Sequence, residues 1–386
     1  MDNGDEFFAR HFRRRAASNR VAMLGAAGDE DDLEAGRRFL ALLAPDGWAV
    51  PSWPTEYGGR GATAEEAAAI ARALARYETP DLYPFLVGLA LIGPTVMTHG
   101  TPEQCTRWLP PIREGHEIWS QLFSEPDAGS DLAGLATRAE ADGDQWRVTG
   151  AKTWTSRAHY AERGLLLART DIDVPKHAGI TAFALPMRQH GVEVRPLRQL
   201  NGDDHFSQVL LDEAVVDDTD RIGDVGDGWR VALTTLDHER AAGGGGGGLE
   251  AGQLIEHLHE HHAASDPIAR QRAAAVLTDM EAARRTAARA RDTGDPRAAT
   301  GGKIRMADAV KAAAALGLDV QGPAGVTGEG DDDWLTVFLT APSISIRGGT
   351  DEIQRNVIGE RVLGLPPEPR IDKQIPYRDI RRTHSR

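Results

Sequence analysis

Residues 145–156 read QWRVTGAKTWTS, a run rich in β-branched and aromatic residues with a period of two. That period is typical of a strand with one buried face. Four more β-rich runs follow up to residue 216, and turn signals such as Asp142-Gly143 and His190-Gly191 bound these runs. Because the runs follow one another without helices and no G-x-G-x-x-G follows a strand, we expect an antiparallel sandwich or barrel, not a parallel dinucleotide-binding sheet.

Helical patterns flank this β-rich region on both sides. Before it, Thr63-Ala-Glu-Glu66 has the form of a capping box, and Thr101-Pro102 has the form of another helix start. After it, residues 266–292 and 300–322 have the period of amphipathic helices. The sequence therefore predicts an α+β multidomain chain with an N-terminal helical domain over 1–119, a β domain over 120–222 and a C-terminal helical domain over 223–386.

The composition excludes several classes of protein. The 386 residues include 58 acidic residues against 44 lysines and arginines, with no basic cluster that could follow a nucleic-acid backbone. The single cysteine, Cys105, allows no internal disulfide, and we expect no metal site. Since no apolar run approaches the roughly 18 residues that span a bilayer and the start lacks an export signal, we expect a cytoplasmic protein with no membrane partner. The basic end, Arg370–Arg386, is interpreted as a solvated tail.

Two stretches carry groups that suit an anionic ligand. Residues 121–133, QLFSEPDAGSDLA, are typical of a surface turn, yet their backbone N–H groups and the Ser124 and Ser130 hydroxyls also suit a phosphate or a polar ring edge. Residues 347–366 join a Gly-Gly loop to a helix through Thr350, which fits either a well-capped helix or an N-terminus that offers N–H groups to a pyrophosphate.

Trp154 is a third candidate for ligand binding. A lone tryptophan within a strand is ordinarily core packing. Here the hydroxyls of Thr153, Thr155 and Ser156 surround it, which also suits a flat heteroaromatic ligand that stacks on the indole and bonds at its edge.

Six motifs in a fixed order give the chain a family resemblance. They are PTEYGGRG (54–61), GTPEQCTRWLPPI (100–112), FSEPDAGSDLA (123–133), DGDQWRVTGAKTWTS (142–156), GDGWRVALTTLDHER (226–240) and GGTDEIQRNVIGERVLGLP (348–366). Together they resemble the acyl-CoA dehydrogenases over nearly the whole chain. The resemblance implies an N-terminal helical domain, a middle antiparallel β-barrel and a C-terminal four-helix bundle, with FAD between barrel and bundle and partly held by a neighbouring subunit.

The resemblance also implies site residues. The cofactor-binding positions are Phe123, Ser124, Ser130, Trp154, Thr155, Ser156, Gln321, Gly325, Thr350 and Glu352. The substrate-binding positions are Ser130, Asp237, Arg240, Gly348 and Gly349.

The catalytic base is expected at Glu239. The family's reaction removes a proton α to the thioester and passes a hydride from the β-carbon to flavin N5, so it needs one carboxylate beside the substrate. Most members place this glutamate where Gly348 stands here. Isovaleryl- and long-chain-type members place it before an arginine on the first helix of the bundle, and Glu239 in LDHER (236–240) matches that position.

Gly243–Gly248 follow on the same segment. A glycine run is typical of a linker, whereas a helix wall without side chains would open a cavity for a bulky or branched acyl group. Because the resemblance places this run beside the acyl chain, the cavity wall is the favoured interpretation.

Several functions stay open. The first is dehydrogenation of a bulky acyl-CoA or acyl-carrier thioester, with an electron-transfer flavoprotein as acceptor, in a homodimer, a homotetramer or a heterotetramer with a paralogous subunit. Since the usual R-x-x-F-G cofactor contact is not evident and Arg347 replaces a common aromatic residue, a non-catalytic, cofactor-completing subunit is the second. A flavin oxidase or hydroxylase of the same fold is the third.

Overall fold

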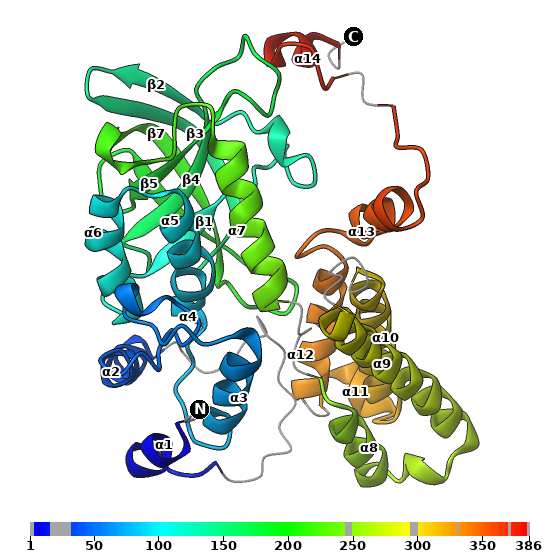
Figure 1. Cartoon of the computed structure of the whole chain (residues 1–386). Helices are drawn as coiled ribbons and strands as arrows, with labels where there is room; N and C mark the ends of the chain where they lie inside the picture. Colours follow the sequence, from blue (N-terminus) through cyan, green and yellow to red (C-terminus); the bar gives the residue numbers. More distant parts are fainter. Residues whose placement is uncertain are drawn as a thin grey trace.

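The structure is a computed structural model that describes residues 4–15, 32–243, 249–293, 300–329, 332–369 and 372–383. It has a helical N-terminal part, a central sheet and a helical C-terminal part in the predicted order (Figure 1). Thr63 forms the predicted capping box with Glu66, and Thr101 caps the predicted helix start, where it also forms a capping box with Gln104. The N-terminal helices are α1 (Asp5–His11), α2 (Leu33–Leu43), α3 (Ala64–Leu74), α4 (Tyr83–Leu86), the π-helix η2 (Val87–Ile92), α5 (Gly93–His99) and α6 (Pro102–Arg113).

The β region forms one sheet in the order β6-β7-β3-β2-β4-β5-β8, with β1 paired to β4. The β1–β4 and β2–β4 pairs are parallel and the others antiparallel. Among the described residues β6 and β8 do not pair with each other, so the sheet is open. The structure therefore corrects the expectation of a closed, fully antiparallel barrel. Its strands are β1 (Trp119–Leu122), β2 (Arg138–Asp142), β3 (Gln145–Ser156), β4 (Arg163–Arg169), β5 (Ile180–Pro186), β6 (Val192–Leu197), β7 (Phe206–Asp217) and β8 (Arg221–Ile222).

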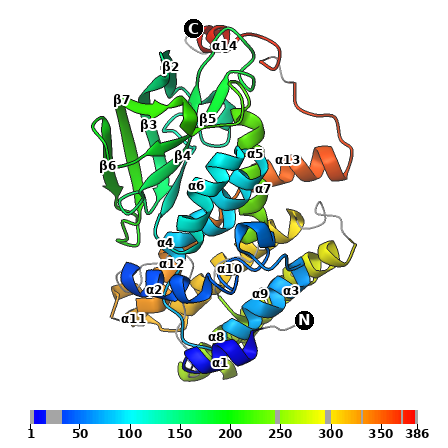
Figure 2. The same cartoon turned by 60° about the vertical axis from the view of Figure 1, so that its left-hand side comes forward.

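Helix α7 (Gly228–Gly243) packs against β5, η2 and α5 (Figure 2). Its apolar residues Val231 and Ala232 belong to the core that the N-terminal helices share with the sheet. Gly228 permits this approach, because a Cβ there would lie 2.7 Å from the backbone of Thr181. The helix that carries Glu239 is therefore fixed to the sheet.

The C-terminal helices form a second core. Buried side chains of α8, α9, α10 and α12 make this core, with Trp334 at its centre among the largest fully buried residues. Gly243 ends α7, and Gly244–Gly248 lie outside the described residues, so the predicted glycine wall does too. The helices are α8 (Ala251–Glu260), α9 (Pro267–Thr293), α10 (Thr300–Asp319), α11 (Pro323–Thr327), α12 (Asp332–Thr340), α13 (Asp351–Val357) and the π-helix η8 (Ile358–Val362).

The last helix, α14 (Tyr377–Thr383), returns to the sheet (Figure 1). Tyr377 is buried and its backbone N–H bonds the Val174 carbonyl, which corrects the expectation of a solvated tail. No helix within the described ranges is long and apolar enough to cross a bilayer.

Candidate active site

A buried ion pair fixes the FSEPDAGSDLA loop to β3. Lys152 is fully buried, and its Nζ lies 2.8 Å from Glu125 Oε1 and 3.1 Å from the Phe123 carbonyl. Glu125 also accepts bonds from the N–H groups of Ala136 (2.6 Å) and Thr137 (2.9 Å). Burial lowers the pKa of Lys152 to about 8, while the Glu125 carboxylate opposes that change. One carboxylate thus holds both ends of the loop.

The end of β3 is irregular and strained. Its register with β7 shifts between Lys152 and Thr155, and Trp154 and Arg157 have φ values of 57° and 53°. Non-glycine residues rarely adopt this left-handed region, and such strain gathers at functional sites. The indole of Trp154 is 60% exposed, with the ring of Phe206 edge-on at 5.8 Å. The core-packing interpretation of Trp154 is therefore wrong, because the bulge turns the indole out of the sheet.

The groups beside Trp154 are polar and ordered. The Ser124 carbonyl accepts a bond from the Thr153 N–H (2.9 Å), which joins the loop to β3. Ser120 Oγ donates to the Ser156 carbonyl at 3.0 Å. Thr155 is fully buried, and its Oγ has no hydrogen-bond partner among the described residues. An exposed aromatic face with spare hydroxyl capacity beside it fits a heteroaromatic ring.

Glu239 faces this region from α7. Gln121 Nε2 on β1 donates to Glu239 Oε2 at 3.3 Å, and η2 packs against both elements. Burial raises the pKa of Glu239, while the bond from Gln121 and the charge of Arg240 act in the opposite direction. Such a half-buried carboxylate is a stronger base than an exposed one.

Asp237 and Arg240 lie on the exposed side of α7, where they form an ion pair with each other. Both remain accessible to a ligand at the surface, but the pair is an exposed one of the kind that contributes little to stability.

The loop before α13 has an unusual backbone. Gly348 and Gly349 have φ values of 63° and 87°, and a Cβ at Gly348 would meet no described atom within 4 Å. Thr350 caps α13 by accepting a bond from the Ile353 N–H at 3.2 Å, and Glu352 is exposed in the first turn. The capped-helix interpretation is thus confirmed.

Arg347 precedes the two glycines of this loop and interacts electrostatically with Tyr83 of α4. It is half-buried, and burial lowers its pKa while Tyr83 opposes the change. The guanidinium of Arg157, at the end of β3, lies 4.7 Å from the centre of the same Tyr83 ring. Tyr83 thus contacts the end of β3, and its electrostatic influence also reaches Arg347 in the R-G-G-T loop.

The remaining predicted residues lie elsewhere. Gln321 is buried in the turn after α10, with its Nε2 3.5 Å from His257 Nε2. A Cβ at Gly325 would lie 2.4 Å from the Leu318 carbonyl oxygen, so this position requires glycine. Ser130 is exposed. Hydrogen bonds with Lys152 and Thr153 place Phe123 and Ser124 beside the Trp154–Ser156 stretch. Strand β1 contacts both Ser156 and Glu239, whereas Gln321 and Gly325 belong to the bundle.

Comparison with known proteins assigns the family. Three family models match in order: the N-terminal domain of acyl-CoA dehydrogenase over residues 6–116, the middle domain over 120–213 and the C-terminal domain over 226–363. The acyl-CoA dehydrogenase IpdE1 of Mycolicibacterium smegmatis is 39% identical over 362 residues, which cover 89% of this chain and 92% of the relative. The chain belongs to the acyl-CoA dehydrogenase family.

Solved structures agree. A steroid acyl-CoA dehydrogenase titled Tcur3481-Tcur3483 has a TM-score of 0.75 at 26% identity and covers 88% of this chain and 94% of its own. The ChsE4-ChsE5 complex of Mycobacterium tuberculosis has a TM-score of 0.73 at 28% identity, with coverages of 86% and 90%. Acyl-CoA dehydrogenases are FAD-dependent flavoproteins, and the exposed indole of Trp154 with its polar neighbours fits that cofactor.

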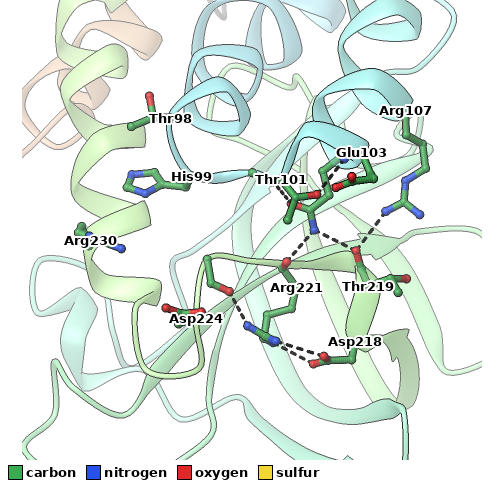
Figure 3. Close-up of a pocket in the computed structure, with 13 residues that line it drawn as sticks. Thr98, His99, Thr101, Glu103, Arg107, Asp218, Thr219, Arg221, Asp224 and Arg230 are labelled. Atoms are coloured by element: carbon green, nitrogen blue, oxygen red, sulfur yellow. Dashed lines mark hydrogen bonds and ion pairs between the residues drawn. The ribbon is translucent and has the colours of Figure 1, made fainter.

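A separate cavity of about 880 Å³ lies between α5, α6, β8 and the start of α7 (Figure 3). None of the predicted site residues of this acyl-CoA dehydrogenase lines it. Arg230 lines it from α7, nine residues before Glu239, which places the two side chains about 180° apart around the helix. Arg221 is bound there by Asp218 and the Gly223 carbonyl. The cavity is thus distinct from the candidate active site.

Sequence reasoning missed Gln121 and the Glu125–Lys152 pair in this acyl-CoA dehydrogenase. Gln121 stands at the start of the loop motif, but its partner Glu239 is 118 residues away. Lys152 and Val148 are both buried positions of β3 and lie four residues apart, so their side chains share one face of the strand. A lysine on a buried face indicates a buried acidic partner, and this was the signal in the sequence that could have revealed the pair.

Proposed function

We propose that this chain is an FAD-dependent dehydrogenase that forms a double bond α,β to the thioester of a bulky or branched acyl group, carried by CoA or by a carrier protein. The observation that supports it most is the half-buried Glu239, with its raised pKa, beside the β1 strand that leads into Phe123 and Ser124. Gly348, where most relatives have the base, has no carboxylate to offer.

Each residue has a defined task in this proposal. Glu239 takes the α-proton onto its carboxylate, and Gln121 holds that carboxylate in one orientation. Bound FAD supplies the acceptor for the β-hydride. Trp154 stacks on the cofactor, and Phe123, Ser124, Thr155 and Ser156 contact it.

The substrate and the outer parts of the cofactor have further contacts in the proposal. Asp237 and Arg240 meet the polar arm of the thioester from the exposed side of α7. Gly348 leaves room for the acyl group, and Gly349 contacts it beside Gly348. Ser130, Thr350 and Glu352 contact the cofactor beyond its ring. Gln321 and Gly325 serve a neighbouring subunit's cofactor.

The bulky acyl group is supported by the open space at Gly348. The similar Tcur3481-Tcur3483 protein is titled a steroid acyl-CoA dehydrogenase, which favours a polycyclic acyl group. The π-helix η2, which touches both α7 and β1, is a local distortion of the kind that often marks a functional site.

Anaerobic titration tests the proposal. The purified chain should show a flavin spectrum that a polycyclic or branched acyl-CoA bleaches. Short straight acyl-CoAs and the free acids should not bleach it. A flavin that no thioester reduces would contradict the proposal.

A mixed assembly is the second proposal, because the ChsE4-ChsE5 relative is titled a complex of two proteins. In this assembly the chain pairs with a paralogous subunit that completes the FAD site, and the chain itself can then be the non-catalytic partner. Flavin content measured for the chain alone and with its paralogue separates a homo-oligomer from the mixed assembly.

The electron acceptor is a separate question. Reoxidation of the reduced protein by an electron-transfer flavoprotein, compared with reoxidation by O₂, separates a dehydrogenase from an oxidase or hydroxylase.

A further inference from the structure

The C-terminal segment Asp372–Thr383 docks on the sheet beside the FSEPDAGSDLA loop. The backbone N–H groups of Tyr377 and Arg378 bond the carbonyls of Val174 (2.9 Å) and Ile172 (3.1 Å). The segment follows the part that matches the family models, since the last of these ends at residue 363. A segment beyond the matched region thus contacts the part of the chain that carries the cofactor-binding residues.

Tyr377 is the centre of this contact. Its side chain is 5% exposed, its ring lies 3.8 Å below the guanidinium of Arg169, and its hydroxyl donates to the Gly134 carbonyl at 3.1 Å. Arg169 itself donates to the carbonyls of Ala133 (2.7 Å) and Leu135 (3.2 Å). Tyr377 and Arg169 therefore hold three consecutive carbonyls at the end of the loop.

A shared cation makes the second connection. Lys176 Nζ lies 2.9 Å from Asp131 Oδ1 and 2.5 Å from Asp372 Oδ2. Asp131 is the neighbour of Ser130 in the loop. The Lys176 side chain is 10% exposed but Asp131 is 65% exposed, so water partly screens this three-residue bridge and the Tyr377 contacts are the stronger connection.

We propose that residues 372–383 are a clamp that holds the FSEPDAGSDLA loop (123–133) in its cofactor-binding conformation by fixing its C-terminal end, with Tyr377 as the positioning residue. The inference rests on the proposed FAD site. A loop held in its bound conformation loses less entropy on binding, so the clamp raises FAD affinity without touching the reacting atoms.

The test compares three single variants in the full-length protein. Tyr377→Phe keeps the ring beneath Arg169 and removes the hydroxyl, Tyr377→Ala removes both contacts, and Arg378→Ala removes an exposed ion pair with Asp173 from the same helix. We expect the Kd for FAD to rise about fivefold in Tyr377→Phe, about thirtyfold in Tyr377→Ala and less than twofold in Arg378→Ala. At saturating FAD all three should recover the wild-type turnover number, which general unfolding would not allow.

Hydrogen exchange in the cofactor-free protein gives an independent measurement. Amides of residues 125–135 should exchange faster in Tyr377→Ala than in wild type, and Arg378→Ala should match wild type. Equal exchange in all variants, or a Tyr377→Ala affinity equal to that of Arg378→Ala, would overturn the clamp. A wild-type chain that binds no flavin would contradict the proposed function, while the exchange measurement would still decide whether Tyr377 holds the loop.

Discussion

Gln121 Nε2 lies 3.3 Å from Glu239 Oε2, so an amide on β1 donates a hydrogen bond to a carboxylate on α7. The bond favours the ionised carboxylate and burial favours the protonated one, and burial has the larger effect because the pKa of Glu239 is raised. This balance sets the pH above which Glu239 can accept a proton.

Replacement of Gln121 should move the pH dependence of the reaction. In Gln121→Met the stabilising bond is lost, so the pKa of Glu239 rises further and the acid limb of the flavin-reduction rate moves to higher pH. Anaerobic stopped-flow measurements across a pH series would show this. Gln145→Met, which removes an amide bound to Asp217 at the exposed end of β3, is the matched control. An unchanged acid limb in Gln121→Met would separate Gln121 from the base.

Replacement of Glu239 should separate activity from stability. Glu239→Gln should slow flavin reduction by at least about 10²-fold and keep FAD bound. Because burial raises the folded-state pKa, the folded protein binds the proton more tightly than the unfolded chain, and wild-type stability falls as pH rises from the ordinary glutamate value through the folded one.

The Tm advantage of Glu239→Gln over wild type should therefore grow with pH over that window and be smallest at acid pH. Glu256→Gln, an exposed substitution of the same kind on α8, should show no such trend. Near-normal flavin bleaching by Glu239→Gln would remove Glu239 from the mechanism.

Removal of the Trp154 indole should affect the cofactor more than the fold. Since the side chain is 60% exposed, Trp154→Ala should change the Tm little, but it should weaken FAD binding by roughly tenfold or more through loss of stacking. Trp334→Ala is the contrasting case, because that indole is 1% exposed in the second core and its loss should cost about 3–5 kcal/mol. Unchanged FAD affinity in Trp154→Ala would argue against a stacking role.

The buried ion pair should be costly to break from one side. Lys152→Met leaves Glu125 buried without its cation, and we expect a loss of about 3–5 kcal/mol in the free energy of unfolding, measured by urea denaturation. Adding Glu125→Gln should restore part of that loss, because the uncompensated charge is removed. Lys373→Met at an exposed position should stay within about 0.5 kcal/mol of wild type. A double variant less stable than Lys152→Met would show that the Glu125 bonds to Ala136 and Thr137 matter more than its charge.

A carboxylate at the usual family position should rescue the base. Gly348→Glu in the Glu239→Gln background has space for the side chain, but the positive φ of Gly348 should cost about 1–2 kcal/mol of stability. We expect part of the lost flavin-reduction rate to return, with Gly348→Gln in the same background as the inactive control. No gain from the glutamate would mean that the two positions do not reach the same α-proton.

The sequence predicted local features better than long-range ones. The capping boxes at Thr63 and Thr101 depend on residues within one helical turn, and both form. The outward turn of Trp154 depends on a bulge between β3 and β7, and a period-two pattern read along one strand does not show a register shift against another.

Two further contacts were missed because they join residues far apart in the sequence. The basic C-terminal end looked solvated because its composition is polar, yet its docking depends on one aromatic residue, Tyr377, that finds Arg169 more than 200 residues earlier. The Gln121–Glu239 contact is similar, because only the packing of α7 on the sheet side brings the two residues together.

Among the described residues the buried apolar side chains divide into separate cores, with a third, smaller one around Phe8 and Trp48, and this division has a thermodynamic consequence. Val231 and Ala232 tie α7 to the sheet and the N-terminal helices, while Leu254 and Trp334 belong to the second core. Because the cores are separate, each can unfold without the others, and we expect the whole chain to unfold in more than one transition. Stability changes from Glu239 or Lys152 variants then describe the core shared by α7 and the sheet. A calorimetric trace with one broad peak should be resolved into its separate enthalpies before a free energy is assigned to any of these variants.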